Sequence, residues 1–510
     1  MESLENALGT VDRIAVHPIS LIDLDQSSLS KTMKQVMDEK RLPLPIRETS
    51  IVYQLHRILL YRRLLLGYPK TADKIRDEAK IDICPNLRGC VWSALLGVSG
   101  DTKGVYNRIN KGARRETDRQ IEVDIPRCHQ YEPLISCPEG GYKLKRVIKA
   151  WLVTNPNLTY WQGLDSLTVP FLYLHYDRED LAFATMSKFI PKYLQGLFQR
   201  DNAKVIQEYL SIFQQLLCHH DPELSNHLSD MDGQAFVPDL YAIPWFLTMF
   251  AHVFPISKII HLWDTMLLYD SSFPLFIGVA IMLRLKRQLL TFTFNDCILS
   301  FSDMPDIDIH DVIKSSIKLH RDTPRSCAFR VFQPEIDVDG VLGMSSHEID
   351  LVARRNEHVP RISVADICRL SGLSRSTMIG TVTGEQFEII DAAEVMKTAV
   401  LDRLFIVDIR SADEYRDGTL PGAHNLAASE AFEEPTEENP FGALKSGHPT
   451  AIRLITARFK SIIIIAGSTT AAAQSFVFSL LKLGYPRLCT LHGGFDHLER
   501  NGATLSIPDP

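Results

Sequence analysis

The sequence predicts two domains of different class, an all-helical domain over residues 46–327 and an α/β domain with a parallel sheet over residues 360–510. The first prediction rests on a succession of long helical patterns with no alternating strand pattern among them. The second rests on buried strand patterns that alternate with helical ones, which is typical of a parallel sheet. With 510 residues the chain exceeds one hydrophobic core, so more than one domain is expected.

Composition narrows the class of protein. Fifty-five Lys and Arg residues against 62 Asp and Glu give a formal charge of −7, which argues against direct nucleic-acid binding. The nine cysteines are scattered and form no CxxC pair, which is typical of a reduced, cytoplasmic protein. No apolar run is long enough for a membrane span. Cys218-His219-His220 has no second Cys or His pair at zinc-site spacing, so no metal is expected.

Helical patterns begin after a polar tail or linker that covers residues 1–45. Residues 51–66 place apolar side chains at helical spacing with basic residues between them, which predicts an amphipathic helix. Turn signals such as Asp221-Pro222 and Phe254-Pro255 separate the patterns that follow. Those further helices are expected at 141–153, 182–197, 202–219, 243–253, 257–268 and 275–290.

The pattern changes after an acidic stretch at 328–359, which is interpreted as an interdomain linker. Residues 362–377 are expected to form the opening helix of the second domain. Strands are predicted at 404–408, 461–466 and 487–491, with a short helix from residue 413 and a longer one over 471–483. This order of strand, helix and strand favours a parallel sheet.

Two short segments contain the side chains that a slow GTPase needs from a partner. In Ile121-Glu-Val-Asp124-Ile-Pro-Arg127 the proline disfavours helix continuation, so Arg127 is expected to project, with Asp124 within reach of its guanidinium. Tyr160-Trp-Gln162 offers a carboxamide that would orient an attacking water. On spacing alone, a structural Asp–Arg pair and a glutamine that satisfies a backbone group at a helix end remain open alternatives.

The order of several motifs resembles the TBC domain, the Rab GTPase-activating fold. The motifs that carry the resemblance are Leu87-Arg88-Gly89-Cys90-Val91-Trp92, then Ile121, Asp124 and Arg127, then Tyr160-Trp-Gln162-Gly163, then Pro244-Trp245-Phe246 and Leu262-Trp263-Asp264. The resemblance implies that Arg127 is an arginine finger and that Gln162 replaces the glutamine of the Rab. Ile121, Asp124, Tyr160 and Arg88 would support them. GTP and Mg²⁺ would belong to the partner, so no cofactor of the chain's own is expected.

The second domain resembles a rhodanese domain. The resemblance lies in Val407-Asp-Ile-Arg410, Asp413-Glu-Tyr415, Gly418-Thr-Leu-Pro-Gly-Ala423 and His492-Gly-Gly-Phe495. Rhodanese chemistry needs a cysteine thiolate in the loop after the central strand. Here that loop reads Ala466, Gly467, Ser468, Thr469 and Thr470, and Cys489 lies on a later predicted strand. We therefore interpret the domain as a catalytically silent interaction module, with an empty anion-binding loop as the alternative.

This order of domains resembles the family of TBC domain-containing protein kinase-like proteins (TBCK), although no kinase-like domain is recognisable in the sequence. The resemblance implies a GTPase-activating protein for a GTP-bound Rab, which is not itself a hydrolase, kinase or sulfurtransferase. It further implies vesicle trafficking, a cytoplasmic location with peripheral attachment to endosomes through partners, and a multiprotein complex of the FERRY type. The alternative is a non-catalytic scaffold that binds partners through both domains.

Overall fold

The computed structural model describes residues 34–231, 233–333, 344, 349–373, 403–436, 441–501, 503 and 505–506. The predicted tail up to residue 33, part of the predicted linker, and residues 374–402 lie outside the described residues. The chain divides into two compact units. The first contains Met1–Asn202 and Pro244–Ser271, and the second contains Ala203–Ile243 and Ser272–Pro510. The boundaries predicted at residues 45, 327 and 359 stay predictions.

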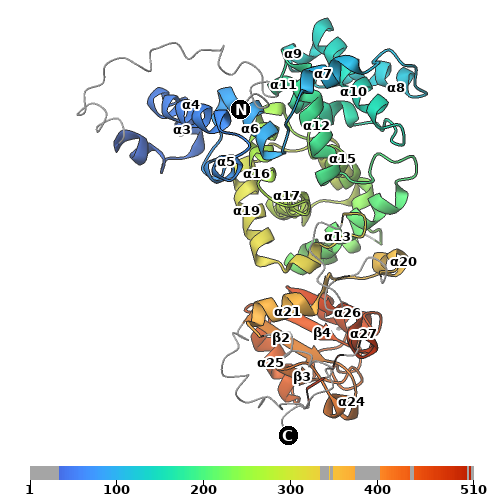
Figure 1. Cartoon of the computed structure of the whole chain (residues 1–510). Helices are drawn as coiled ribbons and strands as arrows, with labels where there is room; N and C mark the ends of the chain where they lie inside the picture. The colour runs from blue at the N-terminus through green and yellow to red at the C-terminus, as the bar shows by residue number, and fades with distance from the viewer. Residues whose placement is uncertain are drawn as a thin grey trace. The chain divides into compact units, whose positions relative to one another are not determined.

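The described part of the first unit is helical, as predicted (Figure 1). Its longer elements are α4 (Ile51–Leu66), α5 (Ala72–Ala79), α6 (Arg88–Leu95), α10 (Pro138–Thr154), α11 (Leu164–Leu174), α12 (Glu179–Tyr193) and α16 (Ile256–Met266). Shorter ones are α3 (Leu44–Thr49), α7 (Thr102–Arg108), α8 (Asp118–Asp124), α9 (Pro133–Ser136), and the 3₁₀ turns η2 (Pro85–Leu87) and η3 (Ile125–Arg127).

Four aromatic side chains fix the helices at the centre of the first unit. Trp263 of α16 lies 4.6 Å from Phe189 of α12, 5.2 Å from Phe171 of α11 and 5.7 Å from Trp92 of α6, measured between ring centroids. Each of these rings is buried. Buried aromatic clusters contribute both apolar area and ring–ring attraction. These ring contacts hold α6, α11, α12 and α16 together. Helix α11 directly follows the loop that contains Gln162.

One helix is shorter than the sequence predicts. The pattern at 243–253 predicted a single helix, but α15 (Ala242–Leu247) ends six residues earlier than that. Met249 and Phe250 have φ angles of 47° and 67°, in the left-handed region. A right-handed helix cannot continue through two such residues. Their apolar side chains are nevertheless buried, which is why the hydrophobic pattern alone suggested a longer helix.

The second unit combines helices with a sheet (Figure 1). Its helices before the sheet are α13 (Ala203–His220), α14 (Pro222–Ser229), α17 (Phe273–Leu289), α18 (Phe294–Ser302), α19 (Ile309–Asp322), α20 (Leu351–Arg355), and the 3₁₀ turns η4 (Pro238–Leu240) and η5 (Arg325–Ala328). Those within the α/β part are α21 (Val364–Ser371), α24 (Ala412–Asp417), α25 (Pro449–Ala457), α26 (Gln474–Lys482) and α27 (Gly494–Arg500).

The sheet has five parallel strands in the order β1-β5-β4-β2-β3. The strands are β1 (Arg361–Ile362), β2 (Leu404–Asp408), β3 (Ala423–Asn425), β4 (Ile462–Ala466) and β5 (Leu488–Leu491). The predicted strands correspond to β2, β4 and β5, so the parallel sheet is confirmed. Sequence patterns missed β1 and β3, which have only two and three residues.

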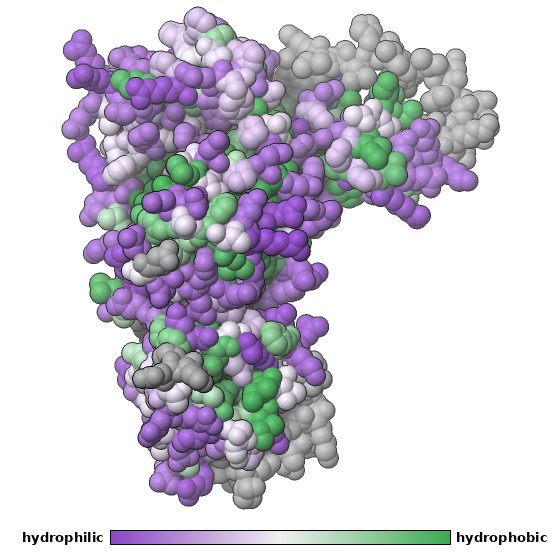
Figure 2. Space-filling model, turned by 180° about the vertical axis from the view of Figure 1, so that it is seen from behind, coloured by the Kyte–Doolittle hydropathy of each residue, from purple (hydrophilic) through white to green (hydrophobic). Residues whose placement is uncertain are grey.

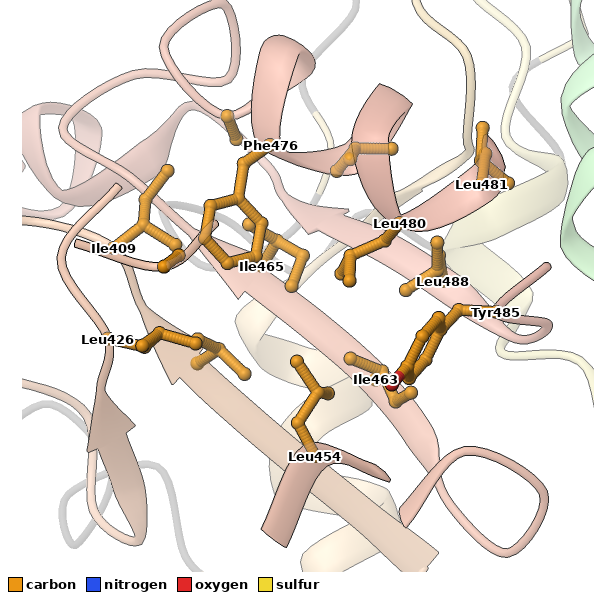
Figure 3. Packing of buried hydrophobic residues seen from close by; sticks show 14 of the residues in the cluster. Ile409, Leu426, Leu454, Ile463, Ile465, Phe476, Leu480, Leu481, Tyr485 and Leu488 are labelled. Carbon is orange, nitrogen blue, oxygen red and sulfur yellow. The ribbon is translucent and has the colours of Figure 1, made fainter. Parts of the chain in front are cut away.

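Helices α25 and α26 pack on one face of this sheet (Figure 3). Ile463 and Ile465 of β4 point into the cluster, where they meet Leu454 of α25 and Phe476 and Leu480 of α26. All five side chains are buried. Because every residue of β4 is buried, the strand has a continuous apolar sequence instead of an alternating one.

Hydrophilic residues cover most of the face seen in Figure 2, and hydrophobic residues gather there in separate patches. Among the residues that the structure describes, the search for a helix long and apolar enough to cross a bilayer finds none.

Candidate functional site

Arg127 lies at the end of a short turn that closes helix α8. The helix ends at Asp124, and the 3₁₀ turn η3 follows, with Pro126 as its second residue. The proline ring fixes φ and removes one backbone donor, which disfavours continuation of the α-helix. Cys128 follows in an extended conformation. Ile121, which is fully buried, anchors α8 to the core. The chain therefore presents Arg127 at the surface, where its side chain is exposed.

Gln162 lies in the loop that precedes helix α11. The Thr159 amide donates to the Phe198 carbonyl at 2.9 Å, and the Trp161 indole donates to the Gln199 carbonyl, also at 2.9 Å. These two bonds fix the loop on one side of Gln162. On the other side, Gly163 precedes the first residue of α11 and has a φ of 107°, which favours glycine. Gln162 itself is exposed.

The Tyr160 hydroxyl connects the two segments. It donates to the Asp124 carboxylate at 2.9 Å and lies 3.4 Å from Asp165 Oδ1. Asp124 also accepts from Gln120 at 2.9 Å, and Asp165 accepts from the Gly163 amide at 3.0 Å. Burial and the neighbouring carboxylates raise the pKa of Tyr160, so its hydroxyl stays a donor. Arg127 follows this bond by three residues along one segment, and Gln162 follows it by two along the other.

The expectation that Asp124 holds the Arg127 guanidinium is wrong. Both carboxylate oxygens of Asp124 are taken by Tyr160 and Gln120, and the carboxylate is buried whereas Arg127 is exposed. Within the described part of the chain, no ion pair or hydrogen bond involves the Arg127 guanidinium or the Gln162 carboxamide. Both open alternatives, a structural Asp–Arg pair and a glutamine that caps a helix end, are therefore absent from the described residues.

Arg88 does not join this site. Its guanidinium donates to Asp264 at 2.9 Å and to Glu48 at 2.9 Å, and the Trp92 indole donates to the other oxygen of Asp264 at 2.6 Å. Arg88 is buried. A buried, doubly paired guanidinium holds elements together and is not available to a partner. The expectation that Arg88 supports the site is therefore corrected. Arg88 instead forms structural ion pairs that join α6 to α3 and α16.

Asp165 and Gln120 are the positioning residues that sequence reasoning missed. Asp165 is the second residue of α11, where an acidic side chain is common because it accepts from backbone amides at the start of a helix. Gln120 lies one turn before Asp124 on α8, at the i, i+4 spacing that lets two side chains meet. Both signals were present in the sequence, but neither indicates which partner the side chain takes.

Comparisons with known proteins bear on both domains. Residues 85–290 match the family described as the Rab-GTPase-TBC domain, and residues 391–501 match the rhodanese-like domain. The chain is 44% identical over 530 residues to the TBC domain-containing protein kinase-like protein of Homo sapiens, with 99% of this chain and 56% of that protein covered. Similarity to proteins of that description extends over nearly the whole of this chain, which contains a TBC domain and a rhodanese-like domain. The chain spans about half the length of the curated relatives that it matches.

Relatives outside vertebrates share part of the chain. The protein of the same description from Dictyostelium discoideum is 39% identical over 319 residues, with 62% of this chain and 30% of that protein covered. The GTPase-activating protein GYP5 of Eremothecium gossypii is 26% identical over 223 residues, with 44% of this chain and 26% of that protein covered. The all-α TBC domain followed by a rhodanese-like domain with a parallel sheet is therefore established.

In the rhodanese-like domain, the loop after β4 is packed against the start of helix α27. The Phe495 amide donates to the Gly467 carbonyl at 3.0 Å, and the Asp496 amide donates to the Ser468 carbonyl at 2.9 Å. Thr470 accepts from the Gly493 amide at 2.9 Å. These bonds turn two carbonyl oxygens of the loop toward the helix start, and the amides that donate in them belong to Gly493, Phe495 and Asp496. The alternative of an empty anion-binding loop therefore stays a prediction.

Cys489, the cysteine nearest to this loop in sequence, is fully buried in β5. Its Sγ lies 3.6 Å from Cys327 Sγ and 3.6 Å from His219 Nδ1. Burial opposes ionisation of the thiol, but the Cys327 hydrogen bond and the nearby His219 lower the pKa of Cys489. Because the Cys489 thiol is fully buried, a substrate that donates sulfur cannot reach it.

The three side chains of Cys218-His219-His220 contact different partners. Cys218 lies 2.8 Å from Ser225 Oγ, His219 Nδ1 lies 2.9 Å from the Leu488 carbonyl, and His220 Nε2 lies 2.9 Å from Thr323 Oγ1. Within the described residues, no group of three or more His, Cys, Asp or Glu side chains is arranged to hold a metal ion.

Proposed function

We propose that the chain is a GTPase-activating protein for a Rab-family GTPase, with Arg127 as arginine finger and Gln162 as glutamine finger. One observation carries the proposal. The two side chains are exposed and unpaired among the described residues, on two segments that the Tyr160–Asp124 hydrogen bond joins. The match to the Rab-GTPase-TBC domain over 85–290 supports the Rab as partner.

Each finger would supply one side chain to the nucleotide site of the Rab. The Arg127 guanidinium neutralises the charge that develops on the phosphate oxygens as the bond to the γ-phosphate breaks. The Gln162 carboxamide accepts from and donates to the attacking water, so that the water lies in line with the leaving group. Nucleotide and Mg²⁺ come with the Rab. Because both side chains start without an intramolecular partner, neither has to break a bond to enter the nucleotide site.

The test is single-turnover GTP hydrolysis by a panel of purified Rabs, with and without the full chain. We expect at least one Rab to be accelerated by wild type, and both Arg127→Ala and Gln162→Ala to remove most of that acceleration. An arginine finger contributes about 10³ to 10⁵ in rate, or roughly 4 to 7 kcal/mol. Equal acceleration by wild type and both variants on every responsive Rab would refute the assignment.

Two matched controls separate the fingers from general surface effects. Arg119 is an exposed arginine on α8, and Gln207 is an exposed glutamine on α13. Arg119→Ala and Gln207→Ala remove the same chemical groups from other positions, so we expect both to keep the wild-type acceleration. A loss with Arg119→Ala as large as that with Arg127→Ala would indicate that charge alone, and not a finger, is responsible.

The second candidate function is a non-catalytic scaffold. It is favoured by the loop at 466–470, which lacks a cysteine and whose Gly467 and Ser468 carbonyls accept from amides of α27. The family resemblance places such a scaffold in an endosomal complex of the FERRY type and in vesicle trafficking. Colocalisation of the tagged full chain with an early-endosome marker tests the location. A complex that keeps its composition with Arg127→Ala in a cell line without wild type would favour scaffolding.

A further inference from the structure

Helix α25 of the rhodanese-like domain exposes a row of three large apolar side chains. Ile452, Ile455 and Phe459 are 54%, 52% and 70% exposed. Ile452 and Ile455 belong to α25, and Phe459 follows Arg458, whose φ of −42° and ψ of −42° continue the helical direction. Spacings of three and four residues place the side chains on one side of a helix. We name Ile452, Ile455 and Phe459 the α25 stripe.

The other side of α25 is also apolar, and it is already packed on the sheet. Ala451 and Leu454 are fully buried in the core cluster, where Leu454 points toward Ile463 (Figure 3). A surface helix normally shows charged and polar residues on the side opposite its buried face, whereas a helix that is apolar on both sides is normally covered on both. Among the described residues nothing covers the α25 stripe, so it is a face without its partner.

The stripe is held in a fixed position. Arg458 donates to the Leu483 and Gly484 carbonyls, at 2.8 Å each, and so fastens the end of α25 to the end of α26. The same guanidinium lies 5.1 Å from the Phe459 ring centroid and 4.8 Å from that of Tyr485. A face that is fixed before binding loses little conformational entropy when a partner arrives.

The charges beside the stripe are basic. Arg453 follows Ile452 and Lys460 follows Phe459 in sequence, and both cations are exposed. Residues 441–495 contain six Lys and Arg residues and no Asp or Glu, although the chain as a whole carries a formal charge of −7. The surface that complements this face is therefore apolar along the stripe and acidic beside it.

We propose that the α25 stripe, with Arg453 and Lys460, docks an acidic amphipathic helix of a partner protein. Such a helix presents apolar anchors at i, i+3 or i+4, and i+7, which match the spacing of Ile452, Ile455 and Phe459. Its flanking Asp or Glu side chains would meet Arg453 and Lys460. The proposal is independent of GTPase activation, since none of these residues lies in the segments of Arg127 and Gln162.

Two other occupants fit the charges less well. In a symmetric contact between two copies of this chain, α25 would meet α25, and the Arg453 and Lys460 side chains of both copies would repel each other. An anionic membrane surface usually requires a cluster of about 4 to 8 Lys and Arg residues. Among the described residues beside the stripe, Arg453 and Lys460 are exposed cations, and Arg458 is engaged by the Leu483 and Gly484 carbonyls. An acidic helix satisfies both the apolar row and the two cations.

The test is fluorescence anisotropy of labelled helical peptides of about 18 residues with the full chain. The first peptide is alanine-based, with leucines along one side and glutamates on both flanks, and the second has lysines in place of the glutamates. Phe459→Asp and Ile455→Asp disrupt the stripe at exposed positions, so folding should be preserved, which circular dichroism checks. Leu299→Asp, at a 68% exposed leucine of α18, is the matched control.

We expect the acidic peptide to bind wild type and Leu299→Asp equally, and Phe459→Asp at least tenfold more weakly. Arg453→Glu with Lys460→Glu should lose the acidic peptide and gain the basic one. The proposal is overturned if neither peptide binds, if both bind equally, or if Phe459→Asp binds like wild type. It is also overturned if the acidic peptide fails while phosphatidylserine vesicles, or a dimer seen by ultracentrifugation, depend on Phe459.

Discussion

The hydroxyl of Tyr160 donates a hydrogen bond of 2.9 Å to the carboxylate of Asp124, and this bond joins two segments that lie 36 residues apart in sequence. Both residues are buried, whereas Arg127 and Gln162 next to them are exposed. This buried bond thus fixes the two segments that carry the proposed fingers relative to each other. Its removal should affect both fingers without touching either one.

Tyr160→Phe should reduce the acceleration of GTP hydrolysis about tenfold and lower the free energy of unfolding by about 1 to 3 kcal/mol. The ring stays buried, but the Asp124 carboxylate loses one of its two donors. Hydrolysis assays and urea unfolding measure the two effects. Tyr142→Phe removes a hydroxyl from an exposed tyrosine and should change neither quantity. Full acceleration by Tyr160→Phe would show that the bond does not position the fingers.

Gly163→Ala should disturb Gln162 through the backbone. Gly163 has a φ of 107°, and a Cβ there would lie 2.8 Å from Thr248 Cγ2. We expect a loss of about 1 to 3 kcal/mol in stability from the strained backbone, and weaker acceleration of hydrolysis per folded molecule. Gly97→Ala is the matched control, since its φ is 74° and no atom lies within 4 Å of the added Cβ. It should lose stability alone, and an equal loss of activity in both variants would contradict this account.

Arg88→Ala should destabilise the fold without affecting the fingers. Removal of the guanidinium leaves the Asp264 and Glu48 carboxylates without their ion-pair partner in a largely buried place. Breaking a buried pair costs about 3 to 5 kcal/mol. Thermal and urea unfolding should show that loss, while acceleration at low temperature, corrected for the folded fraction, stays at the wild-type value. A stable Arg88→Ala protein with reduced activity would instead indicate that Arg88 contributes to the functional site.

His175 should make the protein less stable in mild acid. Burial lowers the pKa of His175 to about 4, so the imidazole is neutral in the folded state, whereas the unfolded chain binds a proton near its ordinary value. Its stabilising contribution is therefore present above about pH 6.5 and is lost as pH falls toward 4, by about 3 kcal/mol in all. Urea unfolding at pH 7.5 and at pH 5 should show a smaller loss for His175→Gln than for wild type. A loss of equal size in both proteins would contradict the assignment.

Much of the fold could be predicted from the sequence, because a long run of apolar residues at helix or strand spacing indicates which side chains are buried. Helix α4 and strand β2 begin and end where the periodicity predicted. Helix α25 was missed for a physical reason, since it is apolar on both sides and shows no helical alternation. Strand β1 was missed because two residues give no period, and its pairing partner β5 lies more than 120 residues later in the chain.

The candidate site, like the fold, could be predicted only in part from the sequence. Pro126 predicted that the helix does not continue to Arg127, and α8 indeed ends at Asp124. No comparable prediction was drawn from Gly163, whose φ of 107° became apparent only in the structure. Side-chain partners were not accessible, because a carboxylate pairs with whichever donor the fold brings to it. Asp124 therefore meets Tyr160 and not Arg127, and Arg88 meets Asp264 across 176 residues of sequence.

The most direct test of the finger assignment compares two arginines of one neighbourhood on the Rab that responds to wild type. Single-turnover hydrolysis is measured with Arg127→Ala, Arg127→Lys and Arg119→Ala under identical conditions. The account predicts that both Arg127 variants lose at least a hundredfold of the acceleration, since a finger contributes about 10³ to 10⁵ and lysine lacks the planar fork, and that Arg119→Ala loses none. Acceleration by Arg127→Ala equal to that of Arg119→Ala would contradict it.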